Sequence, residues 1–232
     1  MITLLIFGAI LPSFILMYTI WKEDKIEKES PALLMKLFFL GVAAAFAAML
    51  AEQLFTWITL HFLEESTPAY IVVDSFLVVA VWEEFFKYFF CYKATWNNPE
   101  FNFRFDAVVY TVFTSLGFAA MENILYVFSF GPGVLPMRAV LAIPAHMGFA
   151  VFMGTCYGTA KVYAAYGAPG KARFHIILGY VIAVLLHGFY DAAATFESGL
   201  WVLIFFVFVI AMDIFVIRQV KIDSRNDRLI HY

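Results

Sequence analysis

Long apolar stretches separated by short polar segments dominate the pattern of this 232-residue chain. A helix needs about 20 apolar residues to cross roughly 30 Å of hydrocarbon. Seven stretches have this character: 2–21, 33–60, 70–92, 105–130, 139–160, 174–197 and 200–218. The short alternating segments of a membrane β-barrel do not occur. The pattern predicts an all-α, polytopic transmembrane helix bundle of about seven spans, or eight if the second span breaks near Glu52 and Gln53.

The composition supports this prediction. Hydrophobic residues make up 63% of the chain and charged residues 14%, whereas an ordinary soluble domain is roughly 45–50% apolar. A soluble protein of this length could not bury so much apolar surface, and no basic tract suited to nucleic acid is present. We therefore expect residues 1–232 to form one transmembrane domain that is embedded in a lipid bilayer and binds no nucleic acid.

The basic residues predict the orientation. Of the 15 lysines and arginines, all but Lys87 and Arg138 flank the spans on one side. By the positive-inside rule this side is cytoplasmic, so the amino terminus lies outside and the carboxyl terminus inside. The first span lacks a small-residue cleavage site and is expected to be a retained anchor. Residues 219–232 are expected to form a basic cytoplasmic tail.

Ionisable side chains interrupt spans three to six, where each charge costs roughly 2.5–3.5 kcal/mol. The polar residues concerned are Glu83, Glu84, Lys87, Glu122, Asn123, His146, His187 and Asp191. The helical rise of about 1.5 Å per residue places their carboxylates and imidazoles roughly 9–20 Å from the outer ends of the spans. Because four helices contribute to this one layer, we expect a shared site in the outer half of the bundle.

Helical spacing adds detail to the expected site. Glu83 and Lys87 are four residues apart and can pair, as can His187 and Asp191, whereas Glu84 is rotated by about 100° from Glu83. The carboxylates outnumber the one ammonium group, so protons or a divalent metal must compensate them. Histidines with carboxylates suit zinc, but a glutamate and a histidine could also activate water without a metal. No HEXXH string decides between these two chemistries.

At these residues the chain resembles the PrsW family of intramembrane proteases, within the wider group that includes type II CAAX prenyl proteases. The resemblance covers about residues 70–195. Its motifs are the string Glu83-Glu84-Phe85-Phe86-Lys87, Phe118 four residues before Glu122 with Asn123 following, His146, and the string His187-Gly188-Phe189-Tyr190-Asp191.

The resemblance implies a multi-pass protease of the bacterial plasma membrane. Such an enzyme makes the first, extracytoplasmic-side (site-1) cut in a single-pass anti-sigma factor and so activates an extracytoplasmic-function sigma factor. The family is described as metal-dependent, whereas its prenyl-protease relatives look like metal-independent glutamate enzymes. This chain departs from those relatives in having Glu122 in place of a histidine and Asp191 in place of an asparagine. Both departures add negative charge, which favours a bound cation.

The resemblance also implies residue roles. Glu83 and Glu84 match the paired glutamates, one of which is the general base, while His187 and Asp191 match the last motif, with ligand or oxyanion roles. Glu122 completes the candidate catalytic set. The candidate zinc ligands are His146, His187, Glu122 and Asp191, and Lys87 is expected to balance charge.

Two other classes of function are compatible with this pattern. Carboxylates and histidines at mid-membrane depth also form the proton relays of transporters, but the chain shows no internal repeat of the kind common in transporters. A non-catalytic scaffold of the same wider group would tolerate loss of the paired glutamates, which are intact here. The sequence therefore favours the protease.

Overall fold

The computed structural model describes residues 2–65 and 67–230, and within these residues every regular element is a helix. The all-α prediction is therefore confirmed. The elements are α1 (Ile2–Glu23), α2 (Pro31–Thr59), α3 (Pro68–Val73), η1 (Asp74–Ala80), α4 (Val81–Thr95), α5 (Asp106–Phe130), η2 (Pro132–Val134), α6 (Leu135–Val140), α7 (Ala142–Ala165), α8 (Pro169–Thr195) and α9 (Gly199–Arg225).

Six helical segments of the described chain are long and apolar enough to span a membrane. They contain α1, α2, α5, α7, α8 and α9, with the short η2 and α6 leading into α7. The seventh expected span is the run α3–η1–α4, which is helical from residue 68 to 95 but widens into a π-helix at η1. Helix α2 is unbroken through Glu52 and Gln53, so the eight-segment alternative does not occur.

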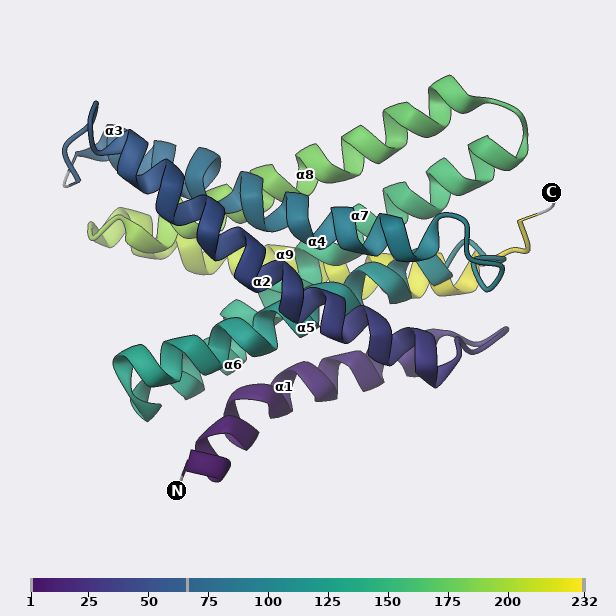
Figure 1. Ribbon diagram of the computed structural model, residues 1–232, viewed down its shortest axis with the longest axis horizontal. Helices are drawn as coiled ribbons and strands as arrows, with labels where there is room; N and C mark the ends of the chain where they lie inside the picture. Colours follow the sequence, from purple (N-terminus) through teal and green to yellow (C-terminus); the bar gives the residue numbers. More distant parts are fainter. Residues whose placement is uncertain (1, 66, 231–232) are drawn as a thin grey trace.

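The ends of the bundle differ in charge. Figure 1 shows the α1–α2, α4–α5 and α7–α8 connections at one end together with the C-terminus, and the N-terminus at the other end. The first of these ends carries most of the lysines and arginines and is called the basic end below. This arrangement fits an odd number of crossings. That the basic end faces the cytoplasm stays a prediction of the positive-inside rule.

Helix α5 forms the centre of the bundle. In its most apolar stretch of 18 residues 78% of the residues are buried, compared with 17% in the corresponding stretch of α1 and 22% in that of α9. It packs against α1, α2, α4 and α7, and α2 crosses in front of it in Figure 1. Because α5 is enclosed on several sides, the polar residues that it carries must find partners inside the protein.

Glycines let the neighbouring helices approach α5 closely. A Cβ atom at Gly117 would lie 2.1 Å from the carbonyl oxygen of Phe38 on α2, and one at Gly154 of α7 would lie 2.4 Å from the Thr111 hydroxyl oxygen. Helix packing in membranes depends on such small residues, because they let backbones come together. These contacts hold α2 and α7 against the helix that carries Glu122.

We expect Gly117→Ala to destabilise the protein by about 1–3 kcal/mol, because the new methyl group forces α2 and α5 apart. Thermal unfolding in detergent should show a Tm lower by several degrees. Gly170→Ala is the matched control, since nothing lies within 4 Å of a Cβ atom at that helical position. Equal Tm values for the two variants would show that the packing of α2 on α5 is not limiting.

The C-terminal segment packs on the basic end. Helix α9 continues to Arg225, and the residues after it lie against the α4–α5 connection. The Ile230 amide donates to the Asn102 carbonyl at 2.7 Å, and the Phe105 amide donates to Asp227 Oδ1 at 2.8 Å. The part of the expected tail within 219–230 is thus helical or packed, and residues 231–232 lie outside the described chain.

Two carboxyl groups are buried in the α1–α2 connection next to this segment. Asp24 is fully buried, and Glu29 is 6% exposed. Burial raises the pKa of Asp24 to about 6 and the pKa of Glu29 to about 7. Removing the charged form from water is the main cause in both cases. The folded protein therefore keeps a proton on Glu29 at pH values where the unfolded chain has released it.

This raised pKa predicts a pH-dependent stability. Since the folded state binds the proton more tightly, the Glu29 carboxyl lowers the free energy of unfolding as the pH rises from about 4.5 to above 7. Glu29→Gln removes this loss, which is roughly 2–3 kcal/mol. We expect a Tm about 5 °C above wild type at pH 8, with the difference shrinking towards pH 4.5. Glu27→Gln, at an exposed position of the same connection, should show no such trend; an equal trend there would refute this explanation.

Candidate active site

A cavity of about 710 Å³ lies between α2, η1, α4, α5, α6, α7, α8 and α9. The cavity lies towards the end of the bundle opposite the basic end, because its lining includes residues at the α6–α7 junction and at the C-terminal end of α8. Its charged and histidine lining residues are Glu52, Asp74, Glu83, Glu122, Arg138, His146, His187 and Asp191. The expected carboxylates and imidazoles of spans three to six thus meet around one pocket.

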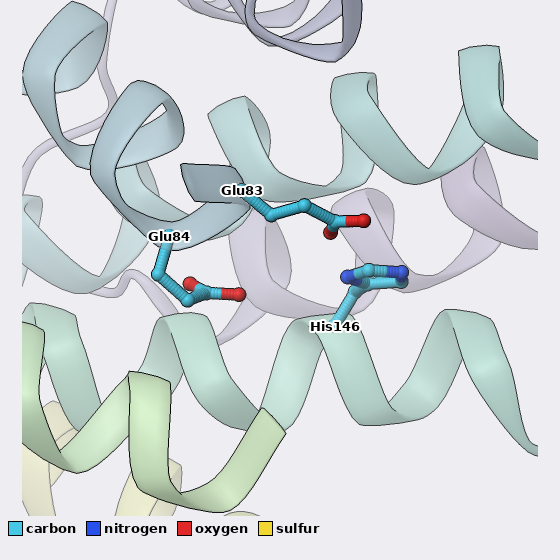
Figure 2. Close-up of side chains that lie close together, drawn as sticks. All are labelled: Glu83, Glu84 and His146. Carbon is cyan, nitrogen blue, oxygen red and sulfur yellow. The ribbon is translucent and has the colours of Figure 1, made fainter. Parts of the chain in front are cut away.

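The paired glutamates lie in the first turn of α4, directly after the π-helix. Glu83 is 5% exposed and lines the cavity, whereas Glu84 is 1% exposed and lies deeper. Figure 2 shows the side chains leaving α4 at different positions, with both carboxylates directed towards His146. One ligand atom from each of Glu83, Glu84 and His146 lies within 4.8 Å of the other two.

Lys87 supplies the positive charge for this group. Its Nζ atom is 2.5 Å from Glu84 Oε1 and 3.4 Å from Glu83 Oε2. It also lies 3.3 Å from His146 Nδ1. The spacing predicted a pair with Glu83, and the structure adds a shorter one with Glu84. The two glutamate side chains and the lysine are buried together, so removing the ammonium would leave the carboxylates uncompensated.

His146 connects α4 with α5. The Ser115 hydroxyl donates to the His146 backbone carbonyl at 3.0 Å and holds this part of α7 against α5. The ammonium group of Lys87 can only donate hydrogen bonds, so Nδ1 of His146 is the acceptor. The Nε2 atom is then the ring donor, and it lies 2.9 Å from Glu122 Oε2. This hydrogen-bond accounting assigns the tautomer of the ring.

His187 lies between three acidic side chains. Its Nδ1 atom is 2.8 Å from Glu84 Oε1, and its Nε2 atom is 3.2 Å from Asp191 Oδ2 and 3.8 Å from Glu83 Oε2. The ring stacks on Phe149 with the centroids 4.8 Å apart. The predicted pairing of His187 with Asp191 four residues later is confirmed, and the stacking fixes the ring's orientation.

Arg138 is a site residue that the sequence interpretation missed. It lies on α6, forms an ion pair with Glu122 at 2.8 Å, and donates from Nε to Asn123 Oδ1 at 2.6 Å. Its guanidinium also lies 3.7 Å from the centroid of the Tyr126 ring. Its isolation was a usable signal, because it is the one basic residue outside the spans that is not on the basic side.

The site has more acidic than basic groups. Six carboxylates, those of Glu84 and the five acidic lining residues, surround it, and the cations are Lys87 and Arg138. Burying uncompensated charge in low dielectric is costly, so protons or a further cation must balance the excess. Two carboxylates and an imidazole in close contact are donors that a divalent metal such as zinc accepts. The residues present therefore fit a metal, although the Lys87 ammonium contacts the same three side chains.

The predicted ligand set overlaps only partly with this compact group. His146 belongs to both, while Glu122, His187 and Asp191 surround the group from α5 and α8. Glu52 and Asp74 also line the cavity; the sequence alone did not distinguish them as site residues. Four of the five candidate catalytic residues line the cavity, namely Glu83, Glu122, His187 and Asp191. The fifth, Glu84, lies deeper and contacts His187.

Paired glutamates and histidines beside a cavity, enclosed in a bundle of membrane-spanning helices, are the arrangement expected of a membrane-embedded peptidase. The comparisons with known proteins agree with this class. The chain belongs to the PrsW family of intramembrane metalloproteases, whose model matches residues 29–217. The resemblance seen in the sequence motifs is thereby confirmed.

Curated relatives match along most of their length. The chain is 28% identical to Protease PrsW of Halalkalibacterium halodurans over 97% of this chain and 99% of the relative. It is 32% identical to Protease PrsW of Clostridioides difficile over 88% and 84%, and 29% identical to that of Bacillus subtilis over 94% of each. No solved structure matches the chain significantly. The apolar helices and these relatives identify a multi-pass bacterial membrane protein, and the family favours the protease over a transporter.

The Arg138–Glu122 pair generates a test of the site's architecture. We expect Arg138→Gln to destabilise the protein by about 3 kcal/mol. The substitution leaves the Glu122 carboxylate, whose side chain is only 19% exposed, without its cation. Glu122→Gln should cost less, since Arg138 keeps its hydrogen bond to Asn123. Thermal unfolding of the single and double variants forms a double-mutant cycle. In the double variant part of the loss should be recovered, and strictly additive losses would show that the two side chains act independently.

Proposed function

We propose that this peptidase makes the site-1 cut in a single-pass anti-sigma factor, on the extracytoplasmic side, and so activates an extracytoplasmic-function sigma factor. The observation that carries the proposal is the convergence of Glu83, His146 and His187 on one cavity, with Glu84 in contact with His187 behind them. The cavity lies away from the basic end, and the positive-inside rule predicts that this part of the bundle faces outward. A cut near the outer membrane surface follows from that position.

The geometry supports a division of roles among the residues. Glu83 faces the cavity, so its carboxylate is the base that accepts a proton from water while the water oxygen bonds to the peptide carbonyl carbon. The same proton then goes to the leaving nitrogen as the C–N bond breaks. His187 has carboxylates at both ring nitrogens, and with a proton on each it donates from Nδ1 to Glu84 and is placed to donate from Nε2 to the oxyanion. Glu84 accepts from His187 and Lys87 and orients both.

A bound metal would add to this chemistry. Glu83, Glu84 and His146 are the side chains whose ligand atoms lie together, and Glu122, His187 and Asp191 complete the ligand candidates. Zinc bound by such donors would polarise the peptide carbonyl and acidify water. Since a carboxylate has two oxygens, Glu83 can bind a cation with one and accept a proton with the other.

We expect Glu83→Gln, Glu84→Gln and His187→Ala each to reduce cleavage at least 100-fold, because each removes a group from the proton-transfer site. The measurement uses purified protein in liposomes with a single-pass anti-sigma factor, and mass spectrometry identifies the cut. Glu65→Gln, a substitution at an exposed position outside the cavity, is the matched control and should retain full activity.

Different outcomes bear on different parts of the proposal. Cleavage that persists in all three site variants would refute the active site. Intact activity on another membrane substrate, with no cut in any anti-sigma factor, would refute the substrate alone. Full activity in the presence of a chelator, in protein without measurable metal, would remove zinc and leave the glutamate chemistry in place.

A further inference from the structure

A second hollow lies on the outside of the bundle, between α4 and α8. Its volume is about 610 Å³, and it shares no lining residue with the cavity of the active site. In Figure 1 the N-terminal half of α8 diverges from α4 towards the basic end. We call this feature the α4–α8 groove; its lining runs from Phe85 to Trp96 on one side and from Pro169 to Tyr180 on the other.

The groove has an aromatic wall. Phe85, Phe89, Tyr92 and Trp96 succeed one another at helical spacings of three or four residues, so they form one face of α4 and its C-terminal turn. Phe89 remains 41% exposed, and Ile177 on the opposite wall is 56% exposed. In a membrane-spanning bundle this surface faces lipid rather than water.

The length of the groove matches one leaflet. From Phe85 to Trp96 the helical rise amounts to roughly 16 Å, about half of the 30 Å hydrocarbon thickness. A transmembrane helix of a partner would need a surface about twice as long. A hydrocarbon chain from a single leaflet is therefore the occupant that fits this surface.

The basic end of the groove carries an unpaired cation. Arg173 lines the groove and is exposed, and within residues 2–65 and 67–230 its side chain forms no ion pair or hydrogen bond. Lys93 lies near the C-terminal end of α4, and Lys171 lies near the start of α8. Neither 85–96 nor 164–180 contains a single aspartate or glutamate. This end of the groove is therefore complementary to an anion.

We propose that the α4–α8 groove binds an anionic phospholipid of the cytoplasmic leaflet. Its acyl chain lies along the aromatic wall, and its phosphate pairs with Arg173, because guanidinium groups bind phosphate through paired hydrogen bonds. Arg173 is only four residues from the start of α8, roughly 6 Å along the axis, which places it at headgroup depth. The site is separate from the proteolytic chemistry.

The test uses the full-length protein with phosphatidylglycerol or phosphatidylcholine added in detergent, and native mass spectrometry counts the bound lipids. We expect wild type to retain phosphatidylglycerol in preference to phosphatidylcholine. Arg173→Gln should reduce this preference about tenfold. Arg225→Gln, which removes another arginine at the basic end, is the matched control and should keep it. Equal behaviour of the two variants would overturn the proposal, because it would indicate unspecific attraction of anions.

A second pair of variants tests the acyl chain. Ile177→Trp fills the groove, whereas Val181→Trp places the same ring one turn further on at an exposed position outside the lining. Only the first should weaken phosphatidylglycerol binding. If inorganic phosphate bound to the wild type as well as phosphatidylglycerol, the groove would be an anion site without a lipid chain. If the wild type formed dimers that only Ile177→Trp lost, the occupant would be a second copy of the protein. Either result would overturn the proposal.

Discussion

The compensation of buried negative charge is the constraint on which the rest of this structure depends. Six carboxylates surround one cavity among membrane-spanning helices, where an isolated charge is strongly unfavourable. Lys87 offsets the pair on α4, and Arg138 offsets Glu122 on α5. His146 links Lys87 to Glu122, and His187 links Glu84 to Asp191. Polar contacts between side chains thus join α4, α5, α6, α7 and α8 around the site.

Such polar contacts need helices that approach closely and hold their positions. The glycines of α2, α5 and α7 provide this, since backbone atoms of adjacent helices lie where a side chain would begin. Interhelical hydrogen bonds contribute only about 0.6–2 kcal/mol each in lipid. Packing around α5 must therefore supply much of the rigidity that keeps Glu122 and His146 at 2.9 Å. The packing of the helices therefore also determines the geometry of the site.

Sequence patterns were sufficient for the helices and for the main members of the site. Hydrophobic length located the spans, and the cost of charge in lipid singled out Glu83, Glu84, His146 and His187. The spacing rule also found the pair of His187 and Asp191, because both residues lie on one helix. Contacts between helices were harder to predict. Lys87 reaches Glu84 and His146 as well as Glu83, and these distances depend on side-chain conformations that helical periodicity does not specify.

Arg138 shows a different limit of sequence reasoning. Counted as a loop residue, it only helped to determine the orientation of the spans. In the structure the short helix α6 folds back towards α5 and brings this arginine to Glu122. The chain turns at Gly131, whose φ is +82°, and α6 follows this turn, whereas the hydropathy pattern began the span only at residue 139. Local backbone direction, rather than composition, therefore decides whether a charge near a span end belongs to the lipid interface or to the active site.

The position of Lys87 links the two chemistries that the site could support. Its ammonium contacts the same three side chains that could bind a metal, at 2.5 to 3.4 Å. A divalent cation and this ammonium therefore act on the same negative charge, and both cannot be fully accommodated by Glu83, Glu84 and His146. A metal held by these side chains would compete with Lys87 for them. The additional acidic groups Glu122 and Asp191 matter here, because they raise the negative charge of the pocket above what Lys87 and Arg138 balance.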